Sequence, residues 1–150
     1  MGYITGFFTN YLLICAFAGW FTAQLIKCVR YVIRRRSFDF RLLMSSGGMP
    51  SSHSATVCAL VTATAKISGM KSVEFALAFI LAFIVMYDAA GVRRAAGEQA
   101  KVLNRMAKEF SDGDARYLDK NLKELIGHTP IQVVVGAILG ILIACVIPAF

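Results

Sequence analysis

The sequence lacks the cysteine pattern of a disulfide-bonded or zinc-binding domain. Its four cysteines are scattered through apolar segments without the short spacing of paired metal ligands; they are Cys15, Cys28, Cys58 and Cys145. We therefore interpret them as small buried side chains. The N-terminus also lacks the basic leader of a cleavable signal, and its first apolar run is long enough to span a membrane.

Acidic residues are scarce as well. The 150-residue chain has 9 Asp and Glu against 16 Lys and Arg, a net charge of +7, and 57% of its residues are hydrophobic. Its mean hydropathy of +0.63 is too high for an ordinary soluble domain. A positive charge can indicate nucleic-acid binding, but the long apolar runs make membrane orientation the better explanation. The composition predicts an all-α integral membrane protein, with residues 1–150 forming a single membrane domain and no nucleic-acid partner.

Four apolar runs approach or reach the ~20 residues that a spanning helix needs. We expect transmembrane helices at residues 8–29, 52–70, 73–90 and 130–150. The second run is rich in Ala and Thr, whose small side chains allow close packing between helices. The fourth contains Gly136 and Gly140 in a G-x-x-x-G pair, which fits packing within the chain and dimerisation equally well.

The polar stretch at residues 91–127 has a helical pattern of its own. Apolar residues recur every three or four positions from 92 to 110, which predicts an amphipathic helix. Residues 111–114 (SDGD) break this pattern, and a second short helix is expected from 115 to 126. We expect this amphipathic helical hairpin to lie on the cytoplasmic surface of the membrane.

Basic residues are distributed very unevenly between the two sides of the predicted spans. Residues 27–41 hold six Lys and Arg, residues 93–123 hold eight, and only Lys66 and Lys71 remain. Because Lys and Arg accumulate in cytoplasmic loops, both basic loops are predicted to be cytoplasmic and both termini to lie outside. The expected location is a cell inner or plasma membrane, with the starts of the second and fourth spans at the cytoplasmic face.

The chain has only two histidines, and each stands at the predicted start of an apolar helix. His53 lies in residues 47–55 (GGMPSSHSA), where two glycines allow a tight bend and Pro50 suits a first helical turn. His128 lies in residues 127–130 (GHTP), directly before the fourth span. Helix N-termini attract anions through their N–H groups and the helix dipole. Two histidines at such positions in a basic protein predict a phosphate-handling site.

Three motifs carry a resemblance to a known family. Residues 49–55 (MPSSHSA), 88–94 (DAAGVRR) and 127–130 (GHTP) resemble, in this order, the divergent branch of the type 2 phosphatidic acid phosphatase superfamily. The resemblance covers nearly the whole chain. It implies a metal-independent phosphatase without a cofactor, acting on a lipid phosphate or related phosphomonoester through a phosphohistidine.

The main superfamily uses three sequence blocks, of which this chain matches the first two in part. Lys27 and Arg34 have the Lys-x6-Arg spacing of the first block, although Arg35 replaces its proline. Residues 50–53 (PSSH) match the second block, Pro-Ser-Gly-His, with Ser52 in place of the glycine.

The third block, Ser-Arg-x5-His-x3-Asp, departs further from the family pattern. His128 matches its histidine, but Leu122 occupies the arginine position and Gln132 the aspartate position. An aspartate there would orient the imidazole and stabilise its charged form, whereas a glutamine orients without carrying charge. Asp88 and Glu124 are the alternative sources of that carboxylate.

The resemblance implies a role for each matching residue. His128 would attack phosphorus and become a phosphohistidine, and His53 would protonate the leaving oxygen. Other residues would hold the phosphate oxygens or support the site: Ser51, Ser52, Lys27, Arg34, Arg93 and Arg94 as phosphate-binding residues, and Asp88 and Gln132 as supporting ones. Membrane lipids and the phosphorylated substrate are the implied partners. A homodimer would complete the bundle, because the main superfamily usually has six spans.

Simpler interpretations exist for the same residues. Either histidine can be a helix-capping or interface residue. Asp88 can form an internal ion pair with Arg93 or Arg94, and the basic cluster 34–36 can be a topology determinant that touches anionic headgroups. The alternative function is a phosphate-headgroup-binding or lipid-handling or transport protein without turnover. The intact second block favours the enzyme, and the incomplete third block favours the binding protein.

Overall fold

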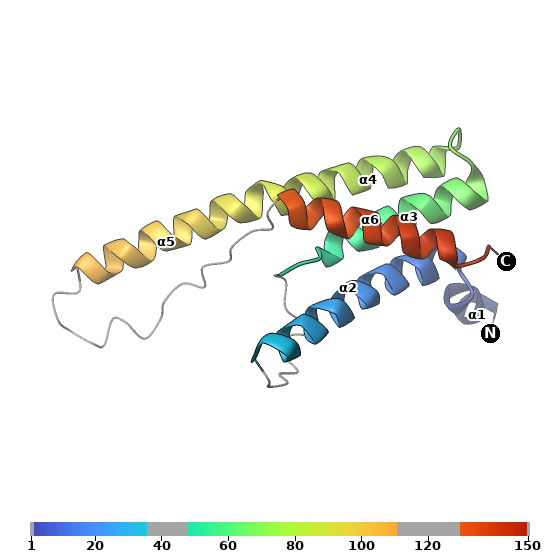
Figure 1. Cartoon of the computed structure of the whole chain (residues 1–150). Helices are drawn as coiled ribbons and strands as arrows, with labels where there is room; N and C mark the ends of the chain where they lie inside the picture. Colours follow the sequence, from blue (N-terminus) through green and yellow to red (C-terminus); the bar gives the residue numbers. More distant parts are fainter. Residues whose placement is uncertain (1, 36–47, 111–129, 150) are drawn as a thin grey trace.

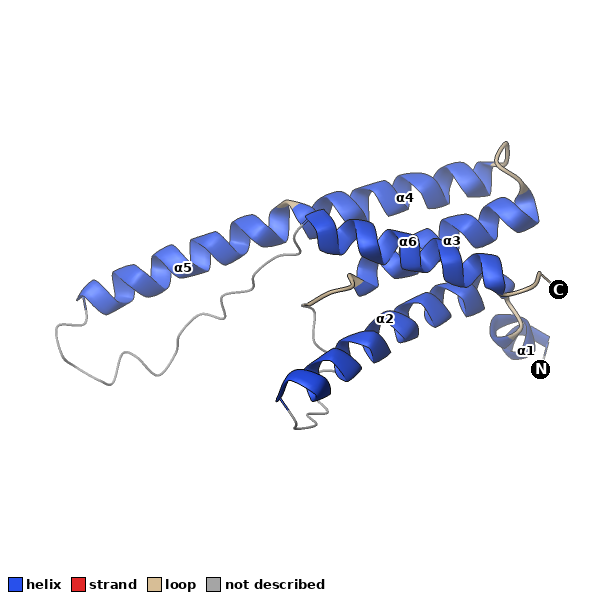
Figure 2. Ribbon diagram, viewed as in Figure 1, coloured by secondary structure: helices blue, strands red, loops and turns tan. Residues whose placement is uncertain are grey.

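The computed structural model describes residues 2–35, 48–110 and 130–149, and every regular element in these ranges is an α-helix (Figures 1 and 2). In chain order they are α1 (Gly2–Phe8), α2 (Tyr11–Arg35), α3 (Ser52–Ser68), α4 (Val73–Ala90), α5 (Val92–Phe110) and α6 (Pro130–Val146). The predicted all-α fold is confirmed for this part of the chain. Two of the helices, α2 and α4, are long and apolar enough to cross a membrane, and α6 is apolar but shorter. The count of four spans remains a prediction.

Helix α3 lies at the centre of the bundle. Helices α2, α4 and α6 each pack against it, whereas α4 and α6 contact each other much less (Figure 1). The buried residues of α3 are nearly all small Ser, Ala, Cys and Thr side chains, which let three neighbours approach. Its threonine hydroxyls are satisfied within the helix, since Thr56, Thr62 and Thr64 donate to carbonyls one turn earlier at 2.7–2.9 Å.

Glycines on the neighbouring helices face these small residues. A Cβ on Gly19 of α2 would lie 2.8 Å from the carbonyl oxygen of Ala55. Gly136 and Gly140 of α6 also leave no room for a side chain, because the backbones of Ser51 and Ala55 lie directly against them. In this structure the G-x-x-x-G pair therefore packs α6 onto α3 within one chain.

The first predicted span begins and ends later than expected. A separate short helix, α1, precedes it, and α2 begins at Tyr11 because the Asn10 side chain caps it. The Asn10 carbonyl oxygen Oδ1 accepts from the N–H groups of Leu12 and Leu13 at 3.0 and 3.2 Å. At its other end, α2 continues through the basic segment to Arg35. Arginine is a good helix former, so the charge ends the apolar run without ending the helix.

The remaining predicted spans match α3, α4 and α6 with small differences. Helix α4 has the predicted bounds, whereas α3 ends at Ser68 and α6 at Val146, before residues 70 and 150. Gly69 ends α3 with φ of +78°, a conformation that favours glycine. Ser72 then caps α4 by accepting from the Phe75 N–H at 3.1 Å.

The carboxyl end of α6 is capped by two side chains from other helices. Lys66 Nζ donates to the carbonyl oxygens of Ala144 and Ile147 at 2.9 and 2.8 Å. The Tyr11 hydroxyl donates to the same two oxygens at 3.3 and 2.9 Å, and Lys66 lies 5.4 Å from the centre of its ring. Lys66 therefore neutralises the negative end of the α6 dipole, although it interrupts an apolar sequence.

The helix predicted at residues 92–110 is confirmed as α5, whereas the hairpin itself remains a prediction. This helix follows α4 after Gly91 and projects beyond the bundle (Figure 1). Val102, Leu103 and Met106 are half exposed, and Lys101 pairs with Glu98 at 3.1 Å. The second predicted helix, residues 115–126, lies outside the described residues.

The prediction for the cysteines is confirmed at three positions and wrong at the fourth. Cys15, Cys28 and Cys58 are buried, Cys145 is exposed, and all four are free thiols. Ala144, the residue before Cys145, faces the core and is fully buried. Successive helical residues point about 100° apart, so Cys145 lies on the outward side of α6.

Candidate functional site

Four helix ends lie on the same side of the bundle, opposite the Lys66 cap (Figure 1). They are the carboxyl ends of α2 and α4 and the amino ends of α3 and α6. These ends carry most of the residues that the sequence singled out and that the structure describes. We call this region the polar end and define it by Lys27, Ser52, His53, Asp88 and Gln132.

The start of α3 is built around Ser51, which is completely buried. As the N-cap residue, its hydroxyl oxygen accepts from the Ser54 N–H at 3.3 Å and from the Ser54 hydroxyl at 3.1 Å. Its own N–H donates to the carbonyl oxygen of Gln132 at 3.1 Å. The Pro-Ser-Ser-His block is thus joined directly to the first turn of α6. The observed role of Ser51 is structural, and its contact with phosphate remains a prediction.

Lys27 is the buried cation of the polar end, with only 7% of its surface exposed. Its Nζ donates to Gln24 Oε1 at 3.0 Å and to Ser52 Oγ at 3.1 Å. Gly48, with φ of +92°, lies against the Lys27 stem, where a Cβ would be 3.9 Å from Cγ and Cδ. The ammonium is therefore turned inward, toward the start of α3.

The electrostatics of this end favour an anion. An ammonium has three donors, and the two oxygens that Lys27 contacts are both neutral. Among the described residues no carboxylate lies within ion-pair distance of Lys27. The partial positive charge at the start of α3 adds to the Lys27 charge. A buried cation with neutral neighbours is costly, and an anionic group would offset that cost.

The loop before α3 is attached to α2 by a second basic residue. Arg30 Nη1 donates to the carbonyl oxygen of Met49 at 3.2 Å. Arg30 is exposed, one turn beyond Lys27 along α2. Two basic side chains of α2 therefore contact residues 49–52, which holds the second sequence block against the first.

The structure brings three further predicted residues to the polar end. His53 lies half-buried in the first turn of α3, Asp88 half-buried in the last turn of α4, and Gln132 half-buried in the first turn of α6. Their catalytic and supporting roles remain predictions. The Gln132 backbone contact with Ser51 does establish that the second and third blocks are neighbours in space.

The other predicted site residues are described only in part. Arg34 lies on α2, and Arg93 and Arg94 lie in the first turn of α5, but their side chains are outside the described part of the structure. His128, together with Leu122 and Glu124, falls in the range 111–129, outside the described residues. The phosphate-binding and nucleophilic roles of this group therefore rest on the sequence.

Gln24 is the site residue that the sequence reasoning missed. It is 3% exposed and accepts from Lys27 one turn later on the same helix. The signal was available, because a polar amide inside an apolar spanning segment is by default a functional candidate. Gln24 and Ser52 both accept hydrogen bonds from the Lys27 ammonium, Gln24 from the same helix and Ser52 from the start of α3.

Comparisons with known proteins agree with this arrangement of motifs. The model of the divergent PAP2 family, the divergent type 2 phosphatidic acid phosphatases, matches residues 8–143. The uncharacterized membrane protein YuiD of Bacillus subtilis (strain 168) is 44% identical, over 95% of this chain and 96% of its own length. No solved structure matches. A membrane-protein relative and two helices able to span a bilayer indicate a membrane location. The family match covers the three motifs and the helices that carry the polar end, and the chain belongs to the divergent PAP2 family.

Proposed function

We propose that this protein is a membrane phosphatase that hydrolyses the phosphomonoester of a lipid phosphate, or of a related molecule, at the polar end. The observation that carries the proposal is the buried Lys27 ammonium, held by Gln24 and Ser52 at the start of α3. Membership of the divergent PAP2 family supports a phosphatase-related role. A phosphoryl dianion is the ligand that would complete the charge of this site.

The proposed reaction proceeds in two displacement steps. The His128 imidazole attacks phosphorus, the bond from phosphorus to the alcohol oxygen breaks, and His53 gives that oxygen a proton. Water then attacks the phosphohistidine while His53 takes up its proton, which releases inorganic phosphate and regenerates His128. Lys27, together with the sequence-predicted Arg34, Arg93 and Arg94, stabilises the charge on the phosphoryl oxygens. No metal ion takes part in either step.

A second candidate function is favoured by Gln132. The main superfamily has an aspartate at this position, which would stabilise the charged imidazole, and a glutamine supplies no charge. The same polar end could therefore bind a phosphate headgroup without cleaving it. In both cases the site faces the cytoplasm, as the distribution of Lys and Arg predicts.

The two functions are separated by assaying purified protein with a panel of lipid phosphates in the presence of a chelator. We expect phosphate release from the wild type and none from His128→Ala. His53→Ala should slow cleavage most for substrates with poor leaving groups, because protonation matters less when the leaving oxygen is already stable.

Gln132→Asp is the decisive variant of this series. A carboxylate behind His128 should raise turnover if the missing charge limits catalysis. If the wild type and Gln132→Asp are both inert over the panel, the enzyme is rejected. Retained binding of vanadate by such an inert protein would identify the headgroup-binding function.

A further inference from the structure

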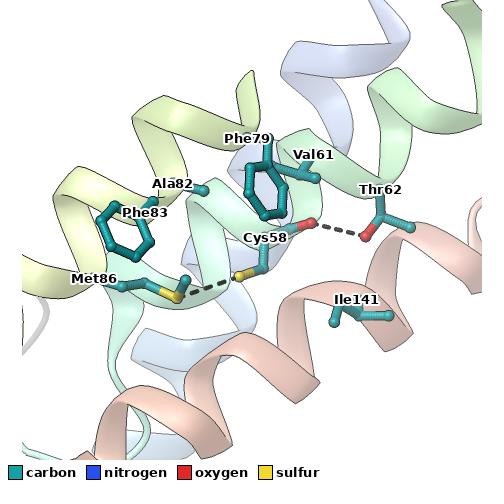
Figure 3. Close-up of a pocket in the computed structure, with 8 residues that line it drawn as sticks. All are labelled: Cys58, Val61, Thr62, Phe79, Ala82, Phe83, Met86 and Ile141. Atoms are coloured by element: carbon teal, nitrogen blue, oxygen red, sulfur yellow. Dashed lines mark hydrogen bonds between the residues drawn. The ribbon is translucent and has the colours of Figure 1, made fainter. Parts of the chain in front are cut away.

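An apolar cavity of about 170 Å³ opens between α3, α4 and α6. Figure 3 shows Phe79 and Phe83 of α4 beside Cys58 of α3, with Ile141 of α6 across the opening. The floor is well packed, since Cys58 and Ala82 are both buried in one hydrophobic cluster. The cavity exists because α4 and α6 both pack on α3 and contact each other little.

The polar groups of the residues that line the cavity form hydrogen bonds within the protein. The Thr62 hydroxyl donates to the carbonyl oxygen of Cys58 at 2.9 Å, and the Cys58 thiol donates to Met86 Sδ at 3.7 Å (Figure 3). All other lining side chains are hydrocarbon. Engineered protein cavities of about 150 Å³ with such walls stay dry and bind apolar molecules. The chemistry of this cavity therefore fits a hydrocarbon ligand.

The position of the cavity connects it to the polar end. Cys58 follows Ser52 by six residues, about 9 Å along α3. On α4, Met86 lies two residues before Asp88, and the lining continues to Phe79, about 10 Å deeper. Phe79 and Phe83 are 53% and 59% exposed, so the cavity opens sideways, toward the hydrocarbon of a bilayer.

The cavity alone does not provide an interface for a second copy. A stable protein interface needs roughly 1,000 Å² of buried surface, far more than this cavity provides. A single flexible chain of methylene groups suits both its volume and its apolar walls.

We propose that this apolar groove, lined by Cys58, Thr62, Phe79, Phe83, Met86 and Ile141, binds one hydrocarbon chain of the lipid whose phosphoryl group lies at the polar end. The position of the phosphoryl headgroup rests on the proposed function, whereas the binding of a hydrocarbon chain in the groove does not. The groove favours a long-chain lipid over a soluble phosphomonoester, because only a hydrocarbon chain makes van der Waals contacts with its apolar walls.

Photocrosslinking of the full chain tests the position of the lipid chain. The protein is placed in phosphatidylcholine vesicles with a trace of phosphatidic acid that carries a diazirine in its acyl chain. We expect adducts at the groove residues Cys58, Thr62, Phe79, Phe83 and Met86 that fall at least ten-fold when excess dioleoyl phosphatidic acid competes. Adducts at Leu77 and Ile84, which are exposed on the opposite side of α4, should not respond to the competitor. If adducts at the groove residues respond to the competitor as little as those at Leu77 and Ile84, the groove proposal is rejected.

A substitution that fills the groove provides an independent readout. Ala82→Phe places a ring in the cavity and should weaken retention of dioleoyl phosphatidic acid at least ten-fold, measured by native mass spectrometry. Ala76→Phe, the same change at an exposed position of α4, is the matched control and should retain the lipid. Unchanged retention in Ala82→Phe contradicts the proposal. Conversion of a dimer to a monomer by Ala82→Phe also contradicts it and assigns the groove to a second copy.

The groove and the proposed function fail in distinguishable ways. Ala82→Phe should leave vanadate stabilisation of the polar end unchanged, because the ring is added away from Lys27. If dioleoyl phosphatidylcholine competes as well as phosphatidic acid for the groove adducts, the chain site stands and the phosphoryl headgroup site is rejected. The same conclusion follows if the wild-type protein does not bind vanadate while both lipids still compete for the groove adducts.

Discussion

Two lysines lie in apolar helices, and the structure gives each a different task. Lys66 at one end donates to the last carbonyls of α6, so a helix dipole accounts for its charge. Within the described part of the chain, Lys27 at the other end contacts neutral oxygens, those of Gln24 and Ser52. The charge of Lys66 is thus balanced within the protein and has a structural role, whereas the charge of Lys27 is available to an anionic ligand. At the scale of the residue, this contrast is the strongest argument for function at the polar end.

Lys27→Met tests that argument because methionine keeps the stem and removes the ammonium. Hydrogen bonds to charged groups contribute about 1.5–3 kcal/mol, so vanadate affinity should fall by about ten- to hundred-fold. The unliganded protein should be as stable as the wild type or more stable, because a costly buried charge is gone. Thermal unfolding with and without vanadate measures both effects.

The matched control for this change is Lys71→Met. Lys71 is exposed in the turn between α3 and α4, at the opposite end of the bundle. The Lys71→Met substitution also removes one positive charge, and vanadate should still stabilise this variant fully. Full vanadate stabilisation of Lys27→Met would show that the buried ammonium is not part of the anion site.

At the scale of the element, α3 organises the molecule. Its small side chains accept Gly19 of α2 and Gly136 and Gly140 of α6 at backbone contact, and its N-cap binds α6 through the Gln132 carbonyl. Because α2 packs closely on α3, Lys27 reaches Ser52. Helices α4 and α6 both pack on α3 but contact each other little, and the apolar groove lies between them. One helix of small residues thus produces the polar end and the groove together.

Gly140→Ala tests this packing with a single added methyl group. The methyl would collide with the Ala55 backbone, so α6 must shift, and overpacking of this kind costs about 1–3 kcal/mol. The expected result is a lower free energy of unfolding in a denaturant titration. Gly6→Ala is the control, since nothing lies within 4 Å of its added Cβ and alanine favours a helix by about 0.5–1 kcal/mol. Equal stability of the two variants would contradict the contact between α3 and α6.

At the scale of the whole molecule, the two ends of the bundle differ in charge. Among the described residues, Lys27 and Arg30 of α2 lie at the polar end and the basic helix α5 begins next to it, whereas Lys66 and Lys71 lie near the other end. Because Lys and Arg accumulate on the cytoplasmic side, this asymmetry predicts that the polar end faces the cytoplasm. The proposed substrate would therefore be reached from the cytoplasmic leaflet.

Cysteine labelling measures this orientation. In a Cys145→Ser background, which removes the exposed native thiol, Ser37→Cys and Ser111→Cys should react only with reagents that enter the cytoplasm. Lys71→Cys, in the turn at the other end, should react with an impermeant reagent from outside. The reverse pattern would put the polar end on the outer face and reject the cytoplasmic site.

The sequence by itself determined the helical class, the bounds of α4 and the start of α3. These follow from the lengths of apolar runs and from local capping residues, which act over a few positions. It also identified the PSSH block and His128 as family motifs, because the order of residue types is preserved along the chain. It missed the start of α2 at Tyr11, which depends on the Asn10 cap, and the exposure of Cys145.

Only the tertiary structure decided which polar residues meet. The inward turn of Lys27, its contact with Gln24 and Ser52, and the bond from Ser51 to Gln132 join positions that are up to 81 residues apart. A basic residue near a helix end satisfies the rule for membrane orientation whether it points to headgroups or into the bundle, so its sequence pattern is the same in both cases. The direction of that side chain is set by the close approach of α2 and α6 to α3, and the small residues that allow the approach act through packing between helices.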